Sequence, residues 1–324
     1  MLVTGGTGSF GKRFVETVLQ KSRVKKLIVF SRDELKQSEM AAQFRDDRLR
    51  FFLGDIRDAG RLQRAFYGVD FVVHAAALKQ VPTLEYNPFE AVLTNIIGAQ
   101  NIINAAIDQK VSHVVALSTD KAVNPVNLYG ATKLCFEKLF IAGNSYAGAK
   151  ETRFSVVRYG NVVGSRGSVI PLFRSLRHQG ILPVTDERMT RFWITLDQGI
   201  SLVLRALDQM HGGEIFVPKI PSMRMLDIIK AIAPECRTRI VGVRPGEKIH
   251  EILLTEDESS RALDLGDIFV IKPNFHWWVK DEHYEGAPLP RDFRYTSDGN
   301  DWWLTPEELQ AMEPEEGQKS PVAA

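Results

Sequence analysis

Short apolar runs alternate with longer stretches of helical periodicity through the first half of the chain. The runs rich in β-branched and aromatic residues lie at Leu2–Thr4, Leu27–Phe30, Leu49–Leu53, Phe71–His74, Val114–Leu117 and Phe154–Arg158. Each run is continuous rather than alternating, which is typical of parallel strands covered on both faces. Helical segments lie between the runs, the first of them expected at about residues 10–20. The pattern predicts an α/β fold with a Rossmann-type doubly wound parallel sheet.

Beyond Gly160 the pattern becomes irregular, and glycine, proline and aromatic residues separate shorter elements. We therefore expect residues 1–160 to form the Rossmann domain, with later segments returning to its sheet. Residues 161–312 are expected to form mainly a smaller C-terminal substrate-binding domain. The polar segment 313–324 contains prolines and is predicted to be a disordered tail. The chain begins inside its first predicted strand, which leads us to expect a few native residues upstream.

Composition narrows the class of protein. The chain has 324 residues, 44% of them hydrophobic, and a net charge of +1, whereas a nucleic-acid surface needs a basic excess. Cys135 and Cys236 show no metal-ligand spacing, so we expect free thiols in a reducing compartment and no metal site. No apolar run approaches the ~20 residues of a membrane span, and the first residues lack a signal-peptide pattern. We expect a cytoplasmic protein with no nucleic-acid or membrane partner.

A glycine-rich loop follows the first predicted strand. Gly5, Gly8 and Gly11 lie between that strand and the first helix. A tight turn that brings the backbone close to a pyrophosphate needs glycine, and the amides at a helix N-terminus bind the negative charge. The loop therefore predicts a dinucleotide cofactor.

The end of the second predicted strand indicates which dinucleotide binds. An acid at this position contacts a ribose 2′-hydroxyl, whereas an arginine accommodates a 2′-phosphate. Ser31 and Arg32 occupy it here, with Lys36 as a second cation, and they favour NADP. Residues 1–160 are thus predicted to be an NADP-binding domain. Asp55 follows the third strand and is placed to accept from the adenine amino group, while His74 is expected to be a packed residue.

Tyr129 and Lys133 are four residues apart and share one face of a predicted helix. Tyrosine is a poor base at neutral pH, but a nearby ammonium and the positive nicotinamide ring favour the phenolate. Tyr129 is therefore a candidate base for a sugar hydroxyl, and Lys133 is expected to hold the nicotinamide ribose as well.

An acid and a base follow Thr119 directly, at the carboxyl end of the fifth predicted strand. In an open α/β sheet this edge faces the ligand crevice. Asp120 and Lys121 suit the elimination of water, in which a base removes a hydrogen next to a ketone and an acid protonates the departing oxygen. Lys121 must be neutral to act as a base. Burial lowers its pKa and Asp120 raises it, so the sequence leaves open both this role and a structural salt bridge.

With these motifs in hand, the chain from residue 1 to about residue 309 resembles the extended short-chain dehydrogenases/reductases. Within them it is most similar to the inverting UDP-N-acetylglucosamine 4,6-dehydratases that begin pseudaminic acid synthesis. The resemblance rests on TGGTGSFG, SRDELKQSEM, GDIRD, AAALKQVP, STDKAVNPVNLYGATK, RYGNVVGSRGSVIP, MTRFWIT, GGEIFVPKIPSM and RPGEKIHE. Retaining sugar dehydratases have Thr-Asp-Glu where this chain has Thr119-Asp120-Lys121, so the lysine discriminates between the two groups.

The resemblance implies three sets of site residues. The catalytic set is Lys121, Asp120, Tyr129, Lys133 and Thr119. The NADP-binding set is Thr7, Gly8, Ser9, Phe10, Ser31, Arg32, Asp33, Glu34, Leu35, Lys36, Asp55, Ile56, Ala75, Tyr129, Lys133 and Val162. The sugar-nucleotide set is Lys79, Leu117, Ser118, Asn161, Arg166, Gly167, Ser168, Val169, Ile170, Thr185, Met189, Arg244 and Glu247.

The implied reaction is the conversion of UDP-N-acetylglucosamine to UDP-2-acetamido-2,6-dideoxy-β-L-arabino-hex-4-ulose and water, in a cycle that regenerates NADP. Such a lyase is expected to form a homo-oligomer, and family members with this arrangement are often hexameric. Two alternatives remain: a nucleotide-sugar 4-epimerase, which uses the same tyrosine and lysine without elimination, and a non-catalytic NADP-binding regulator.

Overall fold

The computed structural model describes residues 1–148, 152–165, 168–275 and 284–312. Its centre is a ten-stranded sheet in the order β16-β14-β15-β10-β6-β5-β4-β1-β2-β3. The run from β10 to β3 is parallel throughout. These strands are β1 (Leu2–Thr4), β2 (Leu27–Ser31), β3 (Leu49–Leu53), β4 (Phe71–His74), β5 (His113–Thr119), β6 (Arg153–Tyr159) and β10 (Ile215–Pro218). The six strands expected from the apolar runs are confirmed.

Segments from the second half of the chain extend this sheet. β10 adds in parallel to β6, and β15 (Ile268–Ile271), β14 (Ala262–Asp264) and β16 (Ala287–Pro288) follow as antiparallel strands. These strands have two to four residues each, so their apolar patterns are too short to distinguish from loops in the sequence.

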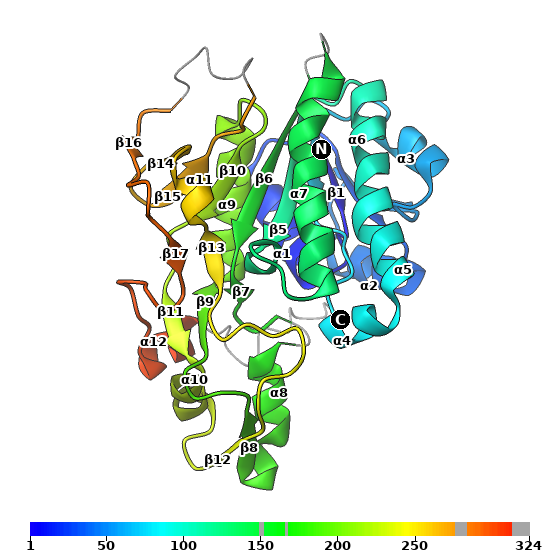
Figure 1. The fold of residues 1–324 in the computed structure, drawn as a ribbon. Helices are drawn as coiled ribbons and strands as arrows, with labels where there is room; N and C mark the ends of the chain where they lie inside the picture. Colours follow the sequence, from blue (N-terminus) through cyan, green and yellow to red (C-terminus); the bar gives the residue numbers. More distant parts are fainter. Residues whose placement is uncertain (149–151, 166–167, 276–283, 313–324) are drawn as a thin grey trace.

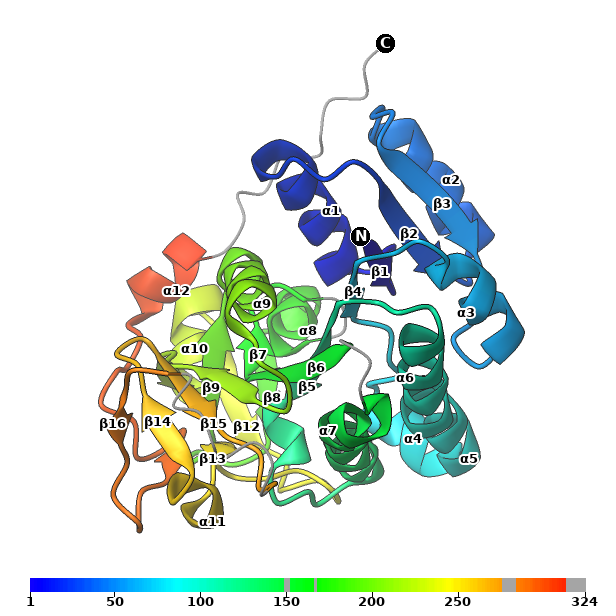
Figure 2. The same cartoon turned by 90° about the horizontal axis from the view of Figure 1, so that it is seen from above.

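Helices cover both faces of the sheet, as a doubly wound fold requires. α1 (Ser9–Lys21) packs beside α9 (Leu196–Gln209) on one face, and α3 (Ala59–Phe66), α6 (Gly98–Asp108) and α7 (Leu128–Ala147) pack together on the other (Figure 2). α2 (Glu34–Gln43) packs on β3, and α4 (Val81–Tyr86), α5 (Pro88–Val92) and a π-helical turn (Leu93–Ile97) lead into α6. Buried side chains of the strands and of these helices form the main hydrophobic core.

A second, smaller core lies beyond the carboxyl end of β6 (Figure 1). It is built around Trp193, Phe173 and Ile228, all of them buried. The surrounding elements are β7 (Asn161–Val162), α8 (Val169–Leu176), a 3-10 turn (Arg177–Gln179), β8 (Ile181–Val184), β9 (Thr190–Ile194), β11 (Ser222–Arg224), α10 (Met225–Ile232), β12 (Arg237–Ile240) and α12 (Pro306–Met312). β11, β9 and β7 form a three-stranded sheet, and β12 pairs with β8.

One more strand pair packs on the main core through Leu253, Leu254 and Tyr295. β13 (Ile252–Leu254) runs antiparallel to β17 (Tyr295–Thr296), and the short helix α11 (Glu256–Ser259) follows β13. The domain division expected at residue 160 stays a prediction, and the expected disordered tail lies outside the described residues. Among the described helices, none has both the length and the apolarity that a bilayer crossing demands. Both cysteines are free thiols.

Candidate active site

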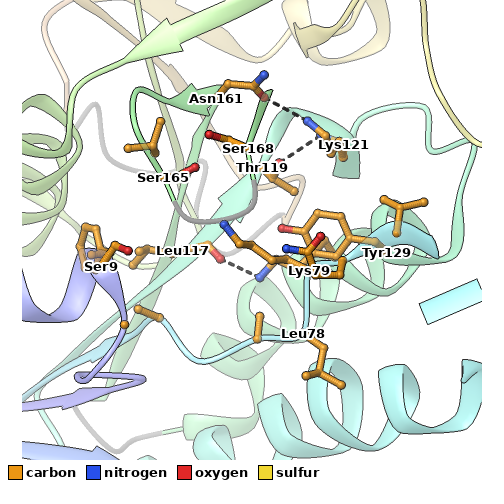
Figure 3. A pocket seen from close by; sticks show the side chains of 18 of the residues that line it. Ser9, Leu78, Lys79, Leu117, Thr119, Lys121, Tyr129, Asn161, Ser165 and Ser168 are labelled. Carbon is orange, nitrogen blue, oxygen red and sulfur yellow. Dashed lines mark hydrogen bonds between the residues drawn. The ribbon is translucent and has the colours of Figure 1, made fainter. Parts of the chain in front are cut away.

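A cavity of about 1180 Å³ lies at the carboxyl edge of the parallel strands. The glycine loop after β1 and the ends of β2, β4 and β5 line one part of it, and β7, the start of α8 and the segment before β13 line the other. Figure 3 shows Lys79, Lys121 and Tyr129 directed into this space, with Asn161 joined to Lys121 by a hydrogen bond. The arrangement places the glycine loop and the candidate catalytic residues around one volume.

The glycine loop has the geometry that a pyrophosphate needs. Gly5 has a φ of +64°, and a Cβ there would lie 2.9 Å from the backbone of Ala76. A Cβ on Gly11 would lie 2.4 Å from Gly6, so the start of α1 can pack against the turn only if residue 11 is glycine. The first turn of α1 carries no acidic residue. Its free amides are therefore available to an anionic group, and the loop fits a dinucleotide.

The end of β2 presents polar groups to the cavity. Ser31 is buried, and the side chain of Gln37 donates to both its carbonyl and its hydroxyl oxygen at 3.0 Å. Asp33 caps α2 by accepting from the Lys36 amide, and the Lys36 ammonium beside it lowers the Asp33 pKa. The Arg32 guanidinium lies 3.8 Å from the Asp55 carboxylate and is 57% exposed. Arg32 is thus free to turn toward a phosphate.

Two buried side chains fix the loop that follows β4. His74 shares a 2.6 Å hydrogen bond with Thr4, stacks on Phe136, and has a pKa lowered to about 3 by burial and then by Lys133. His74 is a packed residue, as expected. Asn95 exchanges hydrogen bonds with the backbone of Leu78, which positions the neighbouring Lys79. Burial and then Lys121 lower the pKa of Lys79.

The candidate catalytic residues begin at the carboxyl end of β5. Asp120, Lys121 and Ala122 form a 3-10 turn, and the Thr119 hydroxyl donates to Asp120 Oδ1 at 2.9 Å. Lys121 Nζ donates to Asp120 Oδ1 at 3.0 Å. It also donates to Asn161 Oδ1 at 3.3 Å (Figure 3). Asp120 is fully buried and does not border the cavity, whereas Thr119 and Lys121 do. The acid expected next to the base is therefore present but lies behind it.

Gly130 brings the tyrosine helix against this turn. A Cβ at residue 130 would lie 2.1 Å from the Lys121 carbonyl oxygen, so only glycine allows this approach. Asn127 caps α7 by accepting from the Gly130 amide at 2.7 Å, and it donates to Gly246. The helix thus begins at a point where Tyr129 stands beside Lys121 in the cavity.

The charge of Lys121 is set by two carboxylates. Burial by itself lowers its pKa, but Asp120 and then Glu251, whose Oε1 lies 3.5 Å from Nζ, together raise it above its usual value. Burial raises the pKa of Asp120, and Lys121 opposes that rise. Lys121 is therefore an ammonium in the unliganded protein, and its nearest possible proton acceptor is a carboxylate that burial has made more basic.

Tyr129 and Lys133 differ from the simple picture of a tyrosine activated by its helical neighbour. Burial raises the pKa of Tyr129 to about 12, and the cation that opposes this rise is Lys121. Lys133 Nζ donates to the Leu117 carbonyl at 2.6 Å and lies 3.2 Å above the Phe136 ring. Burial lowers the Lys133 pKa to about 7. The lysine on α7 is desolvated on apolar surface, because α7 packs its inner face on the sheet.

The opposite wall carries the expected sugar-nucleotide residues. Ser168 and Val169 lie at the start of α8, and Thr185 and Met189 lie on the segment between β8 and β9. Arg244 is 55% exposed and lies 3.9 Å from Glu247. An exposed guanidinium that faces a cavity is well placed to pair with diphosphate oxygens.

Most predicted site residues border the cavity, and a few do not. Glu34 and Leu35 lie on the outer part of α2, where Leu35 is 69% exposed, and Ile170 is turned into the second core. The family resemblance brought them into the predicted sets, but a helix turns neighbouring side chains to different sides. Arg166 and Gly167 lie outside the described residues.

Besides Glu85 on α4, three charged residues of the cavity were not predicted: Arg191 on β9, and Lys248 and Glu251 before β13. The signal for two of them was present, because RPGEKIHE is a narrow motif of which only Arg244 and Glu247 received roles. Arg191 lies within MTRFWIT, which also contributed only Met189. Nothing in their spacing indicates that they meet Lys121.

Residues 1–273 match the sequence profile of the family described as Polysaccharide biosynthesis protein. The chain belongs to this family. Among its relatives, the UDP-N-acetylglucosamine 4,6-dehydratase (inverting) of Campylobacter jejuni is 51% identical over 318 residues, which is 95% of each chain. The UDP-glucose 4-epimerase of Rickettsia canadensis is 45% identical over 280 residues, 84% of this chain and 82% of that one.

Solved structures of other proteins share the fold. Pen from Bacillus thuringiensis superposes with a TM-score of 0.87 at 42% identity and covers 96% of this chain and 95% of its own. The dTDP-glucose 4,6-dehydratase DesIV from Streptomyces venezuelae was solved with NAD and TYD bound. It superposes with a TM-score of 0.68 at 26% identity, and the match covers 76% of this chain and 86% of DesIV. The resemblance to the extended short-chain dehydrogenases/reductases and the Rossmann-type fold are confirmed.

Proposed function

We propose that this protein is an inverting UDP-N-acetylglucosamine 4,6-dehydratase that uses NADP. One observation carries the proposal: the amine of Lys121 opens into the same cavity as Tyr129 and the glycine loop, with a buried carboxylic acid 3.0 Å behind it. A 4-epimerase needs the tyrosine and the cofactor loop but has no use for a buried acid–base pair. The 51% identity to the Campylobacter jejuni dehydratase over nearly the whole chain supports the same reading.

The chain's own residues handle the protons. When bound, NADP would supply an acceptor for the hydride of C4 and a hydride donor for C6, so that it would not be consumed. Tyr129 takes the proton of the C4 hydroxyl as the hydride leaves C4. The ketone that this oxidation forms at C4 makes the hydrogen at C5 acidic. Lys121 removes that hydrogen as a proton, and Asp120 provides the proton that leaves with the C6 oxygen. Reprotonation of C5 from the opposite face inverts that centre.

Lys121 and Asp120 can reach the required protonation states together. Transfer of one proton from Lys121 Nζ to Asp120 Oδ1, across 3.0 Å, yields a neutral amine and a carboxylic acid. Burial favours this neutral pair, because it penalises both charged forms. Since Asp120 does not border the cavity, we propose that its proton reaches the substrate through the Thr119 hydroxyl, which is bonded to the same Oδ1.

The proposed binding sites follow from the two ends of the cavity. The glycine loop from Thr7 to Phe10 binds the pyrophosphate, and Ser31 with Arg32 binds the 2′-phosphate that distinguishes NADP from NAD. Asn161 contacts the acetamido or a hydroxyl group of the sugar, and Arg244 contacts the diphosphate of UDP. We further propose that the protein acts as a homo-oligomer, a hexamer.

The test is incubation of the purified protein with UDP-N-acetylglucosamine in deuterated water, followed by NMR. The expected product has a C6 methyl group, a C4 ketone and solvent deuterium at C5. A product that keeps its C6 hydroxyl and differs only at C4 would instead establish the 4-epimerase, the activity named for the Rickettsia canadensis relative. Binding of NADP without turnover of any UDP-sugar would establish a regulator.

A further inference from the structure

The segment before β13 contributes a second buried carboxylate to the cavity. Glu251 is 2% exposed and lines the cavity beside Lys121. Its Oε1 lies 3.5 Å from Lys121 Nζ and 3.8 Å from Arg191 Nε, and its Oε2 lies 3.5 Å from Lys248 Nζ. Within the described residues, neither Glu251 Oε2 nor Asp120 Oδ2 has a hydrogen-bond partner.

The backbone of Glu251 is fixed from two directions. Its amide donates to Ser297 Oγ at 2.9 Å, and its carbonyl accepts from the Ser297 amide at 2.8 Å. Ser297 Oγ in turn shares a 2.6 Å hydrogen bond with Thr190 Oγ1, next to Arg191 on β9. The backbone that carries this carboxylate is therefore held by Ser297 and, through Ser297, by Thr190 on β9, which is the construction of a rigid positioning group rather than of a solvated side chain.

The two cations beside Glu251 are already engaged with the backbone. Lys248 Nζ donates to the Val123 and Asp120 carbonyls, so it holds the turn that carries Lys121. Arg191 donates to its own neighbour Thr190 and to the Lys248 and Ile249 carbonyls. Lys121 is different, because among the described residues its amine hydrogen-bonds to side chains and to no backbone group, namely to the side chains of Asp120 and Asn161. Among the three, Lys121 is the cation whose direction depends most on Glu251.

We propose that Glu251 is a positioning residue that aims the Lys121 amine between Asp120 and the sugar and keeps it charged until substrate binds. This role rests on the proposed dehydratase function. Asp120 and Glu251 flank the amine from two elements, so the amine stays at the cavity wall when Asp120 takes its proton. No atoms or electrons are exchanged with Glu251 itself, which acts through Lys121.

Several charged or titratable groups face this cluster from the elements packed around it. They are Asp120 and Lys121 on the 3-10 turn, Tyr129 on α7, Arg191 on β9, Lys79 before α4, and Glu247, Lys248 and His250 on the segment that carries Glu251. The carboxylates Asp120 and Glu251 raise the pKa of Lys121, and Arg191 acts against them. Removal of the Glu251 charge therefore moves the pKa of Lys121 downward.

The test compares Glu251→Gln, Glu251→Asp and wild type as holoenzymes with UDP-N-acetylglucosamine, with Glu256→Gln as the matched control. Glu256 lies five residues further along and is 58% exposed. For Glu251→Gln we expect a kcat about tenfold or more below wild type at neutral pH, as for a displaced catalytic group, with KM little changed. The part of its kcat–pH profile in which kcat rises with pH, called here the rising limb, should shift to lower pH by about one pH unit or more. Glu251→Asp should keep the wild-type limb and recover part of kcat.

A second measurement separates misplacement of the Lys121 amine from a general loss of active-site structure. The first oxidation uses Tyr129 and not Lys121, so reduced nicotinamide should build up in a single turnover of Glu251→Gln while product formation lags. Wild-type kcat and pH profile in Glu251→Gln would overturn the role. The role would also be overturned if Glu251→Gln and Glu251→Asp lost kcat equally and the rising limb of the kcat–pH profile did not shift. If Glu251→Gln fails to fold, the role is tested instead by measuring kcat and the build-up of reduced nicotinamide in Glu251→Asp. If wild type and Glu256→Gln give no 4-keto-6-deoxy product, the dehydratase function fails, and this role with it.

Discussion

The ends of β2 and β5 carry charged clusters of similar composition in very different surroundings. At the end of β2, Arg32 is 57% exposed and the Lys36 side chain is 45% exposed, and their partners Asp55 and Asp33 are reached by water. At the end of β5, the Asp120 side chain is fully buried and that of Glu251 is 3% exposed. Water screens the first cluster, so its ion pairs contribute little, whereas the second cluster decides which of its members hold a proton.

This contrast separates recognition from chemistry. The exposed cluster at β2 can rearrange around a phosphate because no single pair there is costly to break. The buried cluster at β5 cannot rearrange freely, since an unpaired charge in that place is strongly unfavourable. The following four predictions test the contrast, from the largest expected effect to the smallest.

Lys121→Ala should cause the largest loss. Removal of the base should lower 4-keto-6-deoxy product formation by about a hundredfold or more, the usual contribution of a positioned proton acceptor. Product formation from UDP-N-acetylglucosamine, followed by NMR, measures this. Lys230→Ala is the control, because Lys230 is 67% exposed and pairs with Asp227 three residues earlier. Full activity in Lys121→Ala would remove the lysine from the base role.

Lys133 should make the stability of the cofactor-free protein depend on pH. Burial lowers its pKa to about 7, whereas an unfolded lysine titrates near ~10.4. In the window between these values the unfolded chain binds a proton that the folded protein does not. The free energy of unfolding therefore rises with pH from about 7 upward.

Lys133→Met removes this dependence. Thermal unfolding of wild type and variant at the two ends of that window should show a smaller gain in Tm with pH for the variant. Lys230→Met should behave like wild type, because its amine is exposed. Equal slopes in Lys133→Met and wild type would show that Lys133 is charged in the folded protein.

Arg32→Ala should change cofactor choice without affecting the fold. Loss of a charge-assisted contact to the 2′-phosphate is expected to weaken NADPH binding by about tenfold or more, with NADH binding nearly unchanged. Fluorescence titration with both dinucleotides measures the ratio. An equal loss for the two would place Arg32 elsewhere than at the 2′-phosphate.

Glu90→Gln should have the smallest effect. Glu90 is 53% exposed and pairs with Arg57 at 3.0 Å at the outer margin of the cofactor end. A surface ion pair of this kind contributes about 0–1 kcal/mol, so Tm and activity should stay close to wild type. A large loss of stability in a melting experiment would mean that the exposed cluster is more strongly coupled than its exposure indicates.

The amount that could be predicted from the sequence differs between the two halves of the chain. Continuous apolar runs predicted the parallel strands up to β6, because strands buried on both faces must be apolar over their whole length. The glycine loop, Ser31 with Arg32, and Tyr129 with Lys133 were also readable, since each depends on a local spacing. Beyond residue 160 the elements are short, and the sequence indicated only that later segments return to the sheet, without placing β10, β14 and β15.

The sequence by itself determined the sheet, the cofactor end and the presence of Asp120 beside Lys121. Only the tertiary structure decided that Asp120 lies behind the cavity wall and that Lys121 meets Glu251 from a segment 130 residues further along the chain. It also placed Lys133 against apolar surface. The reason is physical: a pKa depends on burial and on charges within a few ångströms, and both are set by contacts between distant segments rather than by neighbours in the chain.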